Sequence, residues 1–313
     1  MFQNAARLGP DVVKIGPMIH SWSIGDVRVT SLVEYMGPTH VPEATFPAYS
    51  DDTMQRQQGL LPPGMWYPDI RRFAIAIQIW IVHAGSDVVL IDAGVGNGKT
   101  RPAARMHLLN TLIPQWLSAA GAAPEQVTHV LMTHLHSDHI GWNTTMRDGR
   151  WVPTFPKARH LVPKSDFDYF KGLRDAGKAP DTSFDDSLQP VLDAGLVDFI
   201  DAHSSLPAGL EPVEAFGHTP GMMNYWLRSK GDVGVFSADV FHHPVQILNP
   251  SWNTAFCIVP DAALATRAKV LAEAAATDAL VMPCHFPAPH TGYVRKARDD
   301  YRFEPAPIGT PGP

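Results

Sequence analysis

The sequence predicts an α/β protein. Short apolar runs rich in β-branched residues are followed by turn residues, which is typical of buried strands. Helical periodicity returns between these runs, most clearly over residues 260–278. The two halves of the chain share a rhythm of strand pairs, then a helix, then a loop that carries histidine, which hints at a duplicated two-layer architecture.

The composition bounds the size of the core and the class of partner. At 313 residues and 45% hydrophobic, the chain is long enough for one large α/β domain over residues 1–313. The net charge is −6 and no run of Lys and Arg occurs, so we expect no nucleic-acid partner. No apolar run approaches the roughly 20 residues that span a bilayer, and residues 1–10 lack the apolar stretch of a signal peptide. We therefore expect a cytoplasmic protein without a membrane partner.

The N-terminal part combines a hairpin with a long irregular segment. Residues 1–18 are expected to form a loose arm, and residues 22–34 a hairpin that turns at Gly25. Residues 37–68 are rich in Pro, Gly, Met and aromatic residues and have weak periodicity. So long a loop indicates a lid over a pocket or a subunit contact in a homodimer, with simple packing as the alternative.

The rest of the chain alternates between expected strands and helices. The expected strands are 73–83, 87–91, 127–133, 159–163, 197–200, 213–216, 223–228, 232–237 and 279–282. The expected helices are 100–121 with a break at Pro114, 165–172, and 260–278 with Asp261 as its N-cap. After His290 the chain becomes rich in Pro and Gly, and residues 303–313 are expected to be a tail without structure of its own.

Residues 133–139 read Thr-His-Leu-His-Ser-Asp-His and follow a predicted buried strand. Neutral imidazoles and carboxylates are the ligands that divalent metals such as zinc prefer. The loop at the C-terminal end of a strand is also where open α/β sheets place their sites. A histidine-rich surface loop is the alternative. Asp92, at the end of an earlier strand, either braces this loop or caps its own turn.

Three further metal ligands follow other predicted strands, in loops that contain turn residues or at a strand end. One histidine after a strand is unremarkable, but four loops with the same placement indicate a metal site. A mononuclear zinc site needs three protein ligands and a water, so a larger set suits two metals that share a carboxylate. The candidate ligands are His134, His136, Asp138, His139, His218, Asp239 and His285.

The motif His-x-His-x-Asp-His, followed by Gly-His-Thr-Pro-Gly, an Asp at a strand end and a late His, resembles the metallo-β-lactamase superfamily over about residues 20–290. The resemblance implies an αβ/βα four-layer sandwich of two mixed β-sheets flanked by helices, with the site at the edge of the sheets. It also implies how the ligands are divided between two ions. One ion would bind His134, His136 and His218, the other Asp138, His139 and His285, and Asp239 would bridge them.

The resemblance implies a hydrolytic mechanism. Two divalent ions, zinc in the first place with Mn, Co or Fe as alternatives, would hold a bridging hydroxide that attacks a carbonyl carbon or a phosphorus. Asp138 or Asp239 would shuttle the proton. Around Asp239 and His285 the chain resembles the methyl parathion hydrolase group of the lactonase and organophosphate-hydrolase branch. Acyl-homoserine lactonases of that branch carry a tyrosine three residues after the bridging aspartate, where this chain has His242.

His242 is therefore a catalytic candidate, as a hydrogen-bond donor to a developing oxyanion. The alternative is that His242 and His243 form an exposed pair. Aromatic side chains beside the ligand loops and in the long early segment predict an apolar pocket, with ordinary core packing as the alternative for each. The expected substrate-binding residues are Trp66, Tyr67, Trp142, Phe241, His242, Trp252 and Phe286.

The expected substrate is a small molecule, namely an ester, lactone or phosphotriester with apolar or aromatic groups. Two alternatives stay within the same fold. One is hydrolytic dehalogenation of an activated aromatic, and the other is an iron-dependent, sulfur-oxygenating enzyme. A member that binds a ligand without catalysis is a third alternative, which the intact ligand set disfavours.

Overall fold

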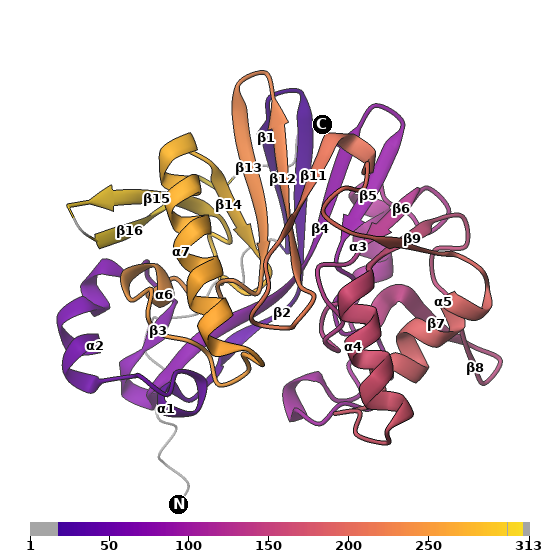
Figure 1. Cartoon of the computed structure of the whole chain (residues 1–313), viewed down its shortest axis with the longest axis horizontal. Coiled ribbons are helices and arrows are strands. Elements are labelled where there is room, and N and C mark those ends of the chain that lie inside the picture. The colour runs from indigo at the N-terminus through magenta and orange to yellow at the C-terminus, as the bar shows by residue number, and fades with distance from the viewer. Residues whose placement is uncertain (1–17, 299, 309–313) are drawn as a thin grey trace, which may run out of the picture.

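The computed structural model describes residues 18–298 and 300–308. Residues 1–17 of the predicted arm and residues 309–313 of the predicted tail lie outside the described residues. Two mixed sheets dominate the described part (Figure 1). The first has the order β1-β2-β4-β5-β6-β9-β10, with β3 paired to β4. Its strands are β1 (Ile19–Ile24), β2 (Val27–His40), β3 (Trp66–Tyr67), β4 (Arg72–Ala84), β5 (Asp87–Ile91), β6 (His129–Leu131), β9 (Arg159–Pro163) and β10 (Val197–Ile200).

The second sheet has six strands in the order β11-β12-β13-β14-β15-β16. Its strands are β11 (Leu210–Glu214), β12 (Met223–Ser229), β13 (Asp232–Ala238), β14 (Leu280–Pro283), β15 (Gly292–Ala297) and β16 (Asp300–Pro305). A separate hairpin consists of β7 (Thr144–Arg147) and β8 (Arg150–Pro153).

Helices lie on the outer sides of both sheets (Figure 1). Helix α7 covers the six-stranded sheet, whereas α3, α4 and α5 lie beside the eight-stranded sheet. The helices are α1 (Pro42–Thr45), α2 (Asp51–Gln57), α3 (Ile113–Ala119), α4 (Lys164–Asp175), α5 (Gln189–Asp193), α6 (Val245–Leu248) and α7 (Pro260–Thr277). Among the described residues, no helix is long and apolar enough to cross a membrane.

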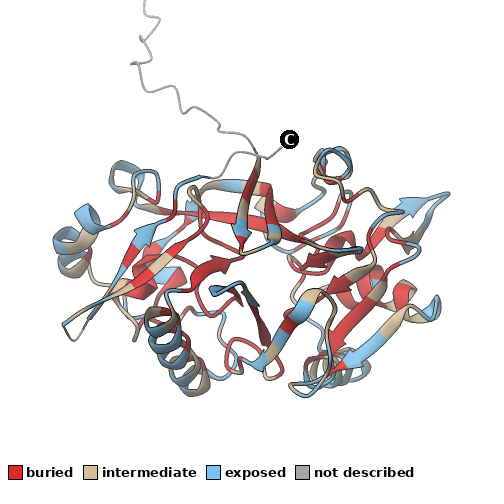
Figure 2. Ribbon diagram, turned by 90° about the horizontal axis from the view of Figure 1, so that it is seen from above, coloured by how far each residue is buried: buried red, intermediate tan, exposed pale blue. Residues whose placement is uncertain are grey.

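The inner faces of the two sheets pack against each other in one apolar cluster. Trp80 of β4 meets Phe236 of β13 with ring centroids 5.9 Å apart, and both side chains are buried. Leu271 of α7 packs on the outer face of one sheet, and Leu117 of α3 on that of the other. In Figure 2 the sheet strands are largely buried, while the helices turn exposed faces outward. These four layers confirm the predicted αβ/βα sandwich of two mixed sheets.

The strand directions explain where the loops with candidate ligands meet. Strand β5 is parallel to β6, β6 to β9, and β13 to β14. The carboxyl ends of parallel strands meet at one edge of a sheet, so their following loops lie together. The sheets also touch there, because Met223 N donates to Thr133 O (2.9 Å) and Tyr225 Oη donates to Met132 O (2.6 Å).

Several element predictions were wrong in physically instructive ways. Within 100–121 the only regular helices are α3, which begins beside Pro114, and a short 3-10 turn at Ala104–Met106. Proline lacks an N–H donor and fits the first turn of a helix rather than its middle. The side chain of Asp261 does not cap α7, whose N-cap residue is Val259.

Two segments expected to be irregular contain regular structure. Strand β2 extends to His40, and α1 and α2 occupy part of 37–68. After His290, β15 and β16 complete the six-stranded sheet, so the predicted tail begins inside a strand. Pairing with a neighbouring strand supplies the backbone partners that the local composition does not reveal.

Candidate metal centre

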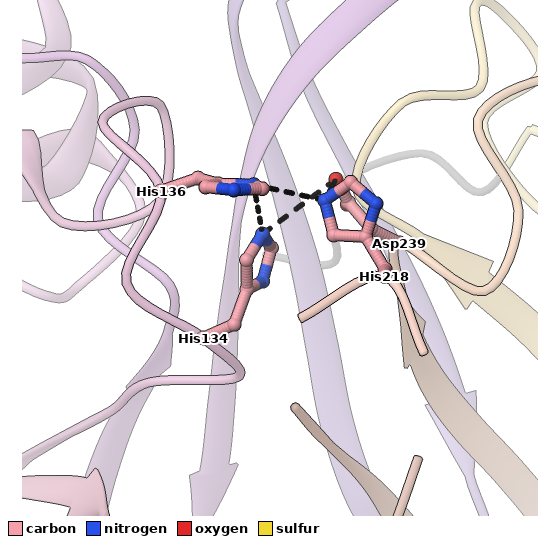
Figure 3. Close-up of side chains that lie close together, drawn as sticks. All are labelled: His134, His136, His218 and Asp239. Atoms are coloured by element: carbon pink, nitrogen blue, oxygen red, sulfur yellow. Dashed lines mark hydrogen bonds and ion pairs between the residues drawn. The ribbon is translucent and has the colours of Figure 1, made fainter. Parts of the chain in front are cut away.

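Four loops bring the candidate ligands together at the carboxyl ends of strands. The His134–His139 loop follows β6, His218 follows β11, Asp239 follows β13 and His285 follows β14. Figure 3 shows three imidazoles from two of these loops pointing toward one another and toward Asp239. All seven ligands predicted from the sequence therefore converge at one place.

The first group consists of His134, His136, His218 and Asp239, whose ligand atoms all lie within 4.8 Å of one another. His136 Nδ1 is 3.0 Å from His134 Nε2 and 2.8 Å from His218 Nε2. Asp239 Oδ2 is 3.1 Å from His218 Nε2 and 3.7 Å from His134 Nε2. Three ring nitrogens and a carboxylate oxygen converging at such distances form the donor set of a divalent ion.

The second group consists of Asp138, His139 and His285. His139 Nε2 is 3.8 Å from Asp138 Oδ1, and His285 Nε2 is 3.9 Å from Asp138 Oδ2. The other oxygen of Asp239 reaches this group, since its Oδ1 is 3.4 Å from His139 Nε2 and 3.1 Å from His285 Nε2. Asp239 thus faces both groups, which is the position that a bridging carboxylate would take.

The electrostatics of the cluster fit bound cations. His139 Nε2 and Asp239 Oδ1 are buried and have no hydrogen-bond partner among the described residues. Burial opposes a charge on either group. Nevertheless the carboxylates of Asp239, Asp92 and Asp138 raise the pKa of His139 well above its usual value. The surrounding imidazoles, with His285 first among them, hold the pKa of Asp239 well below the usual value of an aspartate. The carboxylates of Asp138 and Asp239 therefore favour positive charge at this place, and metal ions would supply it without added protons.

The cluster opens into a cavity of about 400 Å³. Its floor carries His136, Asp138, His218, Asp239 and His285. The remaining wall is mainly apolar. It is lined by His40, Ile75, Ile77, Pro102, Ala103, Arg105, Met106, Leu135, Ser137, Phe170, Pro180, Asp181, Ser183, His242 and Phe256. A concave, largely apolar cavity above a polar cluster is the usual form of a small-molecule site.

Residues 74–299 match the family model of the metallo-beta-lactamase superfamily. The chain belongs to the metallo-beta-lactamase superfamily. Together with the His and Asp cluster, this membership supports a metal-dependent hydrolase as the broad class of activity. It also confirms the family that the sequence motifs resemble.

Solved structures share the fold of this superfamily member over almost its whole length. The hydrolase AbOPH of the beta-lactamase superfamily is 24% identical, with a TM-score of 0.77 over 93% of this chain and 98% of that chain. AidC, a dizinc quorum-quenching lactonase, is 21% identical, with a TM-score of 0.73 over 93% and 98% of the two chains. A probable metal-dependent hydrolase from Staphylococcus aureus is 18% identical, with a TM-score of 0.72 over 92% and 100%.

A curated relative matches a shorter stretch. Ribonuclease Z of Mycobacterium sp. (strain KMS) is 34% identical over 96 residues, which cover 31% of this chain. The matched stretch spans 27% of the length of ribonuclease Z.

Asp92 braces the metal loop, which was one of its two predicted roles. Its Oδ1 accepts from Thr133 N at 2.8 Å, and its Oδ2 accepts from Thr133 Oγ1 at 2.8 Å. The same Oδ2 lies 2.8 Å from His139 Nδ1, and Cys284 Sγ donates to it at 3.2 Å. With Nδ1 held by a carboxylate, His139 turns its Nε2 toward Asp138 and Asp239.

Asp166, which the sequence reasoning missed, joins two ligand loops. Its Oδ2 accepts from Leu135 N at 2.8 Å and its Oδ1 from Gly221 N at 3.0 Å. A Cβ at Gly221 would lie 2.1 Å from Asp166 N, so no larger residue fits there without a shift. Burial raises the pKa of Asp166, although both backbone donors favour its ionised form. In sequence Asp166 was one residue of the predicted helix 165–172, and nothing local distinguished it.

His242 lies at the cluster rather than on the surface. Its Nε2 is 3.2 Å from Asp239 Oδ2, and its ring stacks on His285 with centroids 5.2 Å apart. Burial lowers the pKa of His242 to about 4. His243 is also buried, and its Nε2 lies 3.0 Å from Met65 O. The alternative of an exposed histidine pair was therefore wrong.

The predicted aromatic wall requires a correction, because the six aromatic side chains do not line the cavity. Trp142 is in the core beneath the eight-stranded sheet, where its Nε1 donates to Glu34 Oε1 at 2.6 Å. Phe241 and Phe286 pack in the core between α7 and the six-stranded sheet.

The other three lie around the early segment. Trp252 and Trp66 pack in a separate cluster that includes Phe73, and half-buried Tyr67 pairs with Arg72 in a short strand. Large aromatic side chains gain most from burial in packed cores, so proximity in sequence to a ligand loop is a weak guide to the pocket. Phe170 and Phe256 are the aromatic rings that do line the cavity.

Proposed function

We propose that this protein is a dinuclear metal-dependent hydrolase of esters, lactones or phosphotriesters with an apolar body. One observation carries the proposal. Two groups of ligand atoms share Asp239 and lie at the floor of a largely apolar cavity of about 400 Å³. Zinc is the first choice of metal because three of the ligands in one group are imidazoles.

Bound divalent ions would supply a Lewis acid for the substrate oxygen and lower the pKa of water so that a nucleophile exists at neutral pH. The residues of the chain would hold and orient these reactants. The side chain of Asp138 is 15% exposed, the most open of the carboxylates in the cluster. Imidazoles around it keep its pKa low, at about 2, against the opposing effect of burial. We assign Asp138 the role of accepting the proton of the attacking water, with Asp239 as the alternative.

We assign His242 the role of hydrogen-bond donor to the substrate oxygen. It lines the cavity beside Asp239, and a fixed donor at the point where negative charge develops lowers the barrier of acyl or phosphoryl transfer. The shape of the rest of the wall favours substrates with alkyl or aryl groups. Ile75, Ile77 and Met106 offer no hydrogen bonds to a sugar or a nucleotide.

The test is a hydrolysis panel on a sample whose metal content has been measured by mass spectrometry. The panel holds p-nitrophenyl esters, lactones, paraoxon-type triesters, activated aryl halides and a structured precursor RNA. We expect two ions per chain and turnover of at least one of the first three classes. Removing the ions with a chelator should abolish turnover, and adding zinc back should restore it.

Other outcomes would redirect the proposal. Turnover confined to aryl halides would favour hydrolytic dehalogenation, and one iron with oxygen consumption would favour the sulfur-oxygenating alternative. No turnover of any class by a sample holding two ions would contradict the proposal. The single domain over residues 1–313, the homodimer and the cytoplasmic location stay predictions.

A further inference from the structure

Arg105 lines the cavity wall, and its guanidinium forms no hydrogen bond or ion pair with the part of the chain that the structure describes. It lies in the 3-10 turn Ala104–Met106 and is the single Lys or Arg among the residues that line the cavity. Its Nε is buried and makes no hydrogen bond with any described residue. Among the described residues its guanidinium also takes part in no ion pair. The residue is half-buried, and a guanidinium on a cavity wall that forms no ion pair with a described residue is suited to bind an anionic ligand.

Two buried arginines of this chain use their terminal nitrogens for pairing within the described residues. Arg101, four residues earlier, donates to Asp186 Oδ2 at 2.7 Å and to Asp186 Oδ1 at 2.9 Å. Arg267 donates to Val240 O at 3.0 Å and to Pro250 O at 2.9 Å. The Nε of Arg101 has no partner either, so Arg105 differs in its terminal nitrogens, which pair with no described residue, and in its place on the cavity wall.

The carboxylates of the cavity are held elsewhere. Asp181 also lines the cavity, but its Oδ1 accepts from Ser183 N at 2.8 Å and it makes no ion pair with Arg105. Asp138 and Asp239 belong to the metal centre. The chain thus offers Arg105 no anionic partner of its own within the cavity.

His40 links the position of Arg105 to that of the metal centre. Burial lowers the pKa of His40 to about 3, and the charges that assist are Arg105 first, then His285 and His242. The pKa of His40 thus depends on the charge of Arg105 as well as on the charges of His285 and His242. Its ring contacts Phe256 edge-on at 6.4 Å between centroids, and Phe256 in turn lies 5.9 Å from His242. Arg105, His40, Phe256 and His242 all line the same cavity.

We propose that Arg105 binds a carboxylate on the substrate, so that the substrate is an ester or lactone carrying an acidic group at a distance from the bond that is cleaved. The inference rests on the proposed hydrolytic function. The guanidinium presents a planar fork of donors that matches a carboxylate. With the carboxylate at Arg105 and the ester or lactone bond at the metal centre, the apolar part of the substrate between them is buried and the substrate binds in one orientation. Arg105 is a specificity-determining residue in this scheme and takes no part in bond cleavage.

The experiment compares two esters with the same six-carbon acyl chain. One is p-nitrophenyl hexanoate and the other is the mono-p-nitrophenyl ester of adipic acid, which adds a terminal carboxylate. The wild type should prefer the acidic ester, and Arg105→Gln should lower the ratio of kcat/KM for acidic over neutral ester by about tenfold or more, since a charge-assisted bidentate contact is lost. Arg105→Lys should keep part of the preference. A ratio that stays the same in Arg105→Gln would overturn the inference.

Arg302→Gln is the matched control, because Arg302 is exposed on the edge strand β16 and makes no ion pair among the described residues. It should leave the ratio at the wild-type value. Thermal unfolding and metal content are measured for each variant. A Gln variant that has lost its metal or its fold is replaced by Arg105→Lys, whose intermediate ratio is then the deciding value.

Binding of non-hydrolysable analogues separates this inference from the proposed function. Titration calorimetry compares adipic acid monoanilide with hexananilide on the metal-loaded protein. Weaker binding of the acidic anilide to Arg105→Gln, by about tenfold, supports the inference even if neither ester is hydrolysed. Binding through the metal centre instead would leave the affinity unchanged in Arg105→Gln, and the inference would be wrong. If neither ester is hydrolysed, the binding result alone decides the inference, and the proposed function is decided by the full hydrolysis panel.

Discussion

The metal cluster and the cavity wall are built by different means. Each ligand loop leaves the end of a strand, and buried acceptors such as Asp92 and Asp166 fix it from behind. Much of the wall comes from two segments with little regular structure, 102–106 and 180–183, which line the cavity together with residues of β2, β4 and α4. Rigid aim matters for metal ligands, whereas irregular segments can change between relatives without disturbing the sheets.

The wall nevertheless has a clamp of its own at Asp186. Its carboxylate accepts from Arg101, and Lys99 Nζ lies 3.3 Å from Asp186 Oδ1. The side chains of Lys99 and Arg101 are both completely buried. The clamp ties the segment before Pro102 to the segment after Ser183, so it joins two of the segments that line the cavity. We therefore expect a substitution in the metal cluster to abolish hydrolysis, and a substitution in the clamp at Asp186 to change how the substrate fits.

Asp239→Asn should have the largest effect. The amide keeps the shape but removes the negative charge that both ligand groups share, so at least one ion should be lost. We expect kcat/KM to fall by at least about a hundredfold, the upper range for loss of an outer partner of a metal ligand. Asp198→Asn, in an exposed ion pair with Arg159, is the control and should keep both ions. Two bound ions and full activity in Asp239→Asn would refute the bridging role.

Asp186→Asn should have an intermediate effect, on stability and substrate fit rather than on metal. Two buried cations would lose their shared carboxylate, which costs about 3–5 kcal/mol for a broken buried pair. Chemical denaturation measures this loss. At a temperature where the variant stays folded, metal content should match the wild type while KM rises more than kcat falls. Loss of metal with an unchanged KM would show that the wall and the cluster are not separate units.

The difference between the two regions also decides what the sequence reveals. Ligand chemistry and strand ends are both local, so the seven candidate ligands follow from motifs at predicted strand ends, and the sandwich follows from the family that those motifs resemble. The bracing of His139 by Asp92 was predicted as one of two alternatives, since a carboxylate at a strand end suits either role. Asp166 was not predicted, because its carboxylate oxygens accept from Leu135 N and Gly221 N only after the fold has brought these two backbone groups together.

The wall depends on tertiary packing that no local pattern records. The periodicity over 100–121 predicted a helix, whereas Arg105 lies in a 3-10 turn of three residues. The Pro and Gly content after His290 suggested a chain without regular structure, but β15 in that part of the chain pairs with β14. Trp142 lies next to the metal loop in sequence, but its indole turns away to Glu34. Residues near a site in sequence therefore predict the ligands of this fold far better than they predict its pocket.

Trp66→Leu should have the smallest effect and tests that correction. Trp66 packs on Phe73 with ring centroids 4.8 Å apart, and it does not line the cavity. The variant should lose some stability through poorer packing while kcat and KM for the best ester stay within about twofold of wild type, as for substitutions away from functional features. Phe256→Ala is the paired variant, because Phe256 lines the cavity and its loss should raise KM for substrates with long apolar groups. If Trp66→Leu raised KM as much as Phe256→Ala, the early segment would have to close over the substrate, and the lid predicted for residues 37–68 would be favoured over simple packing.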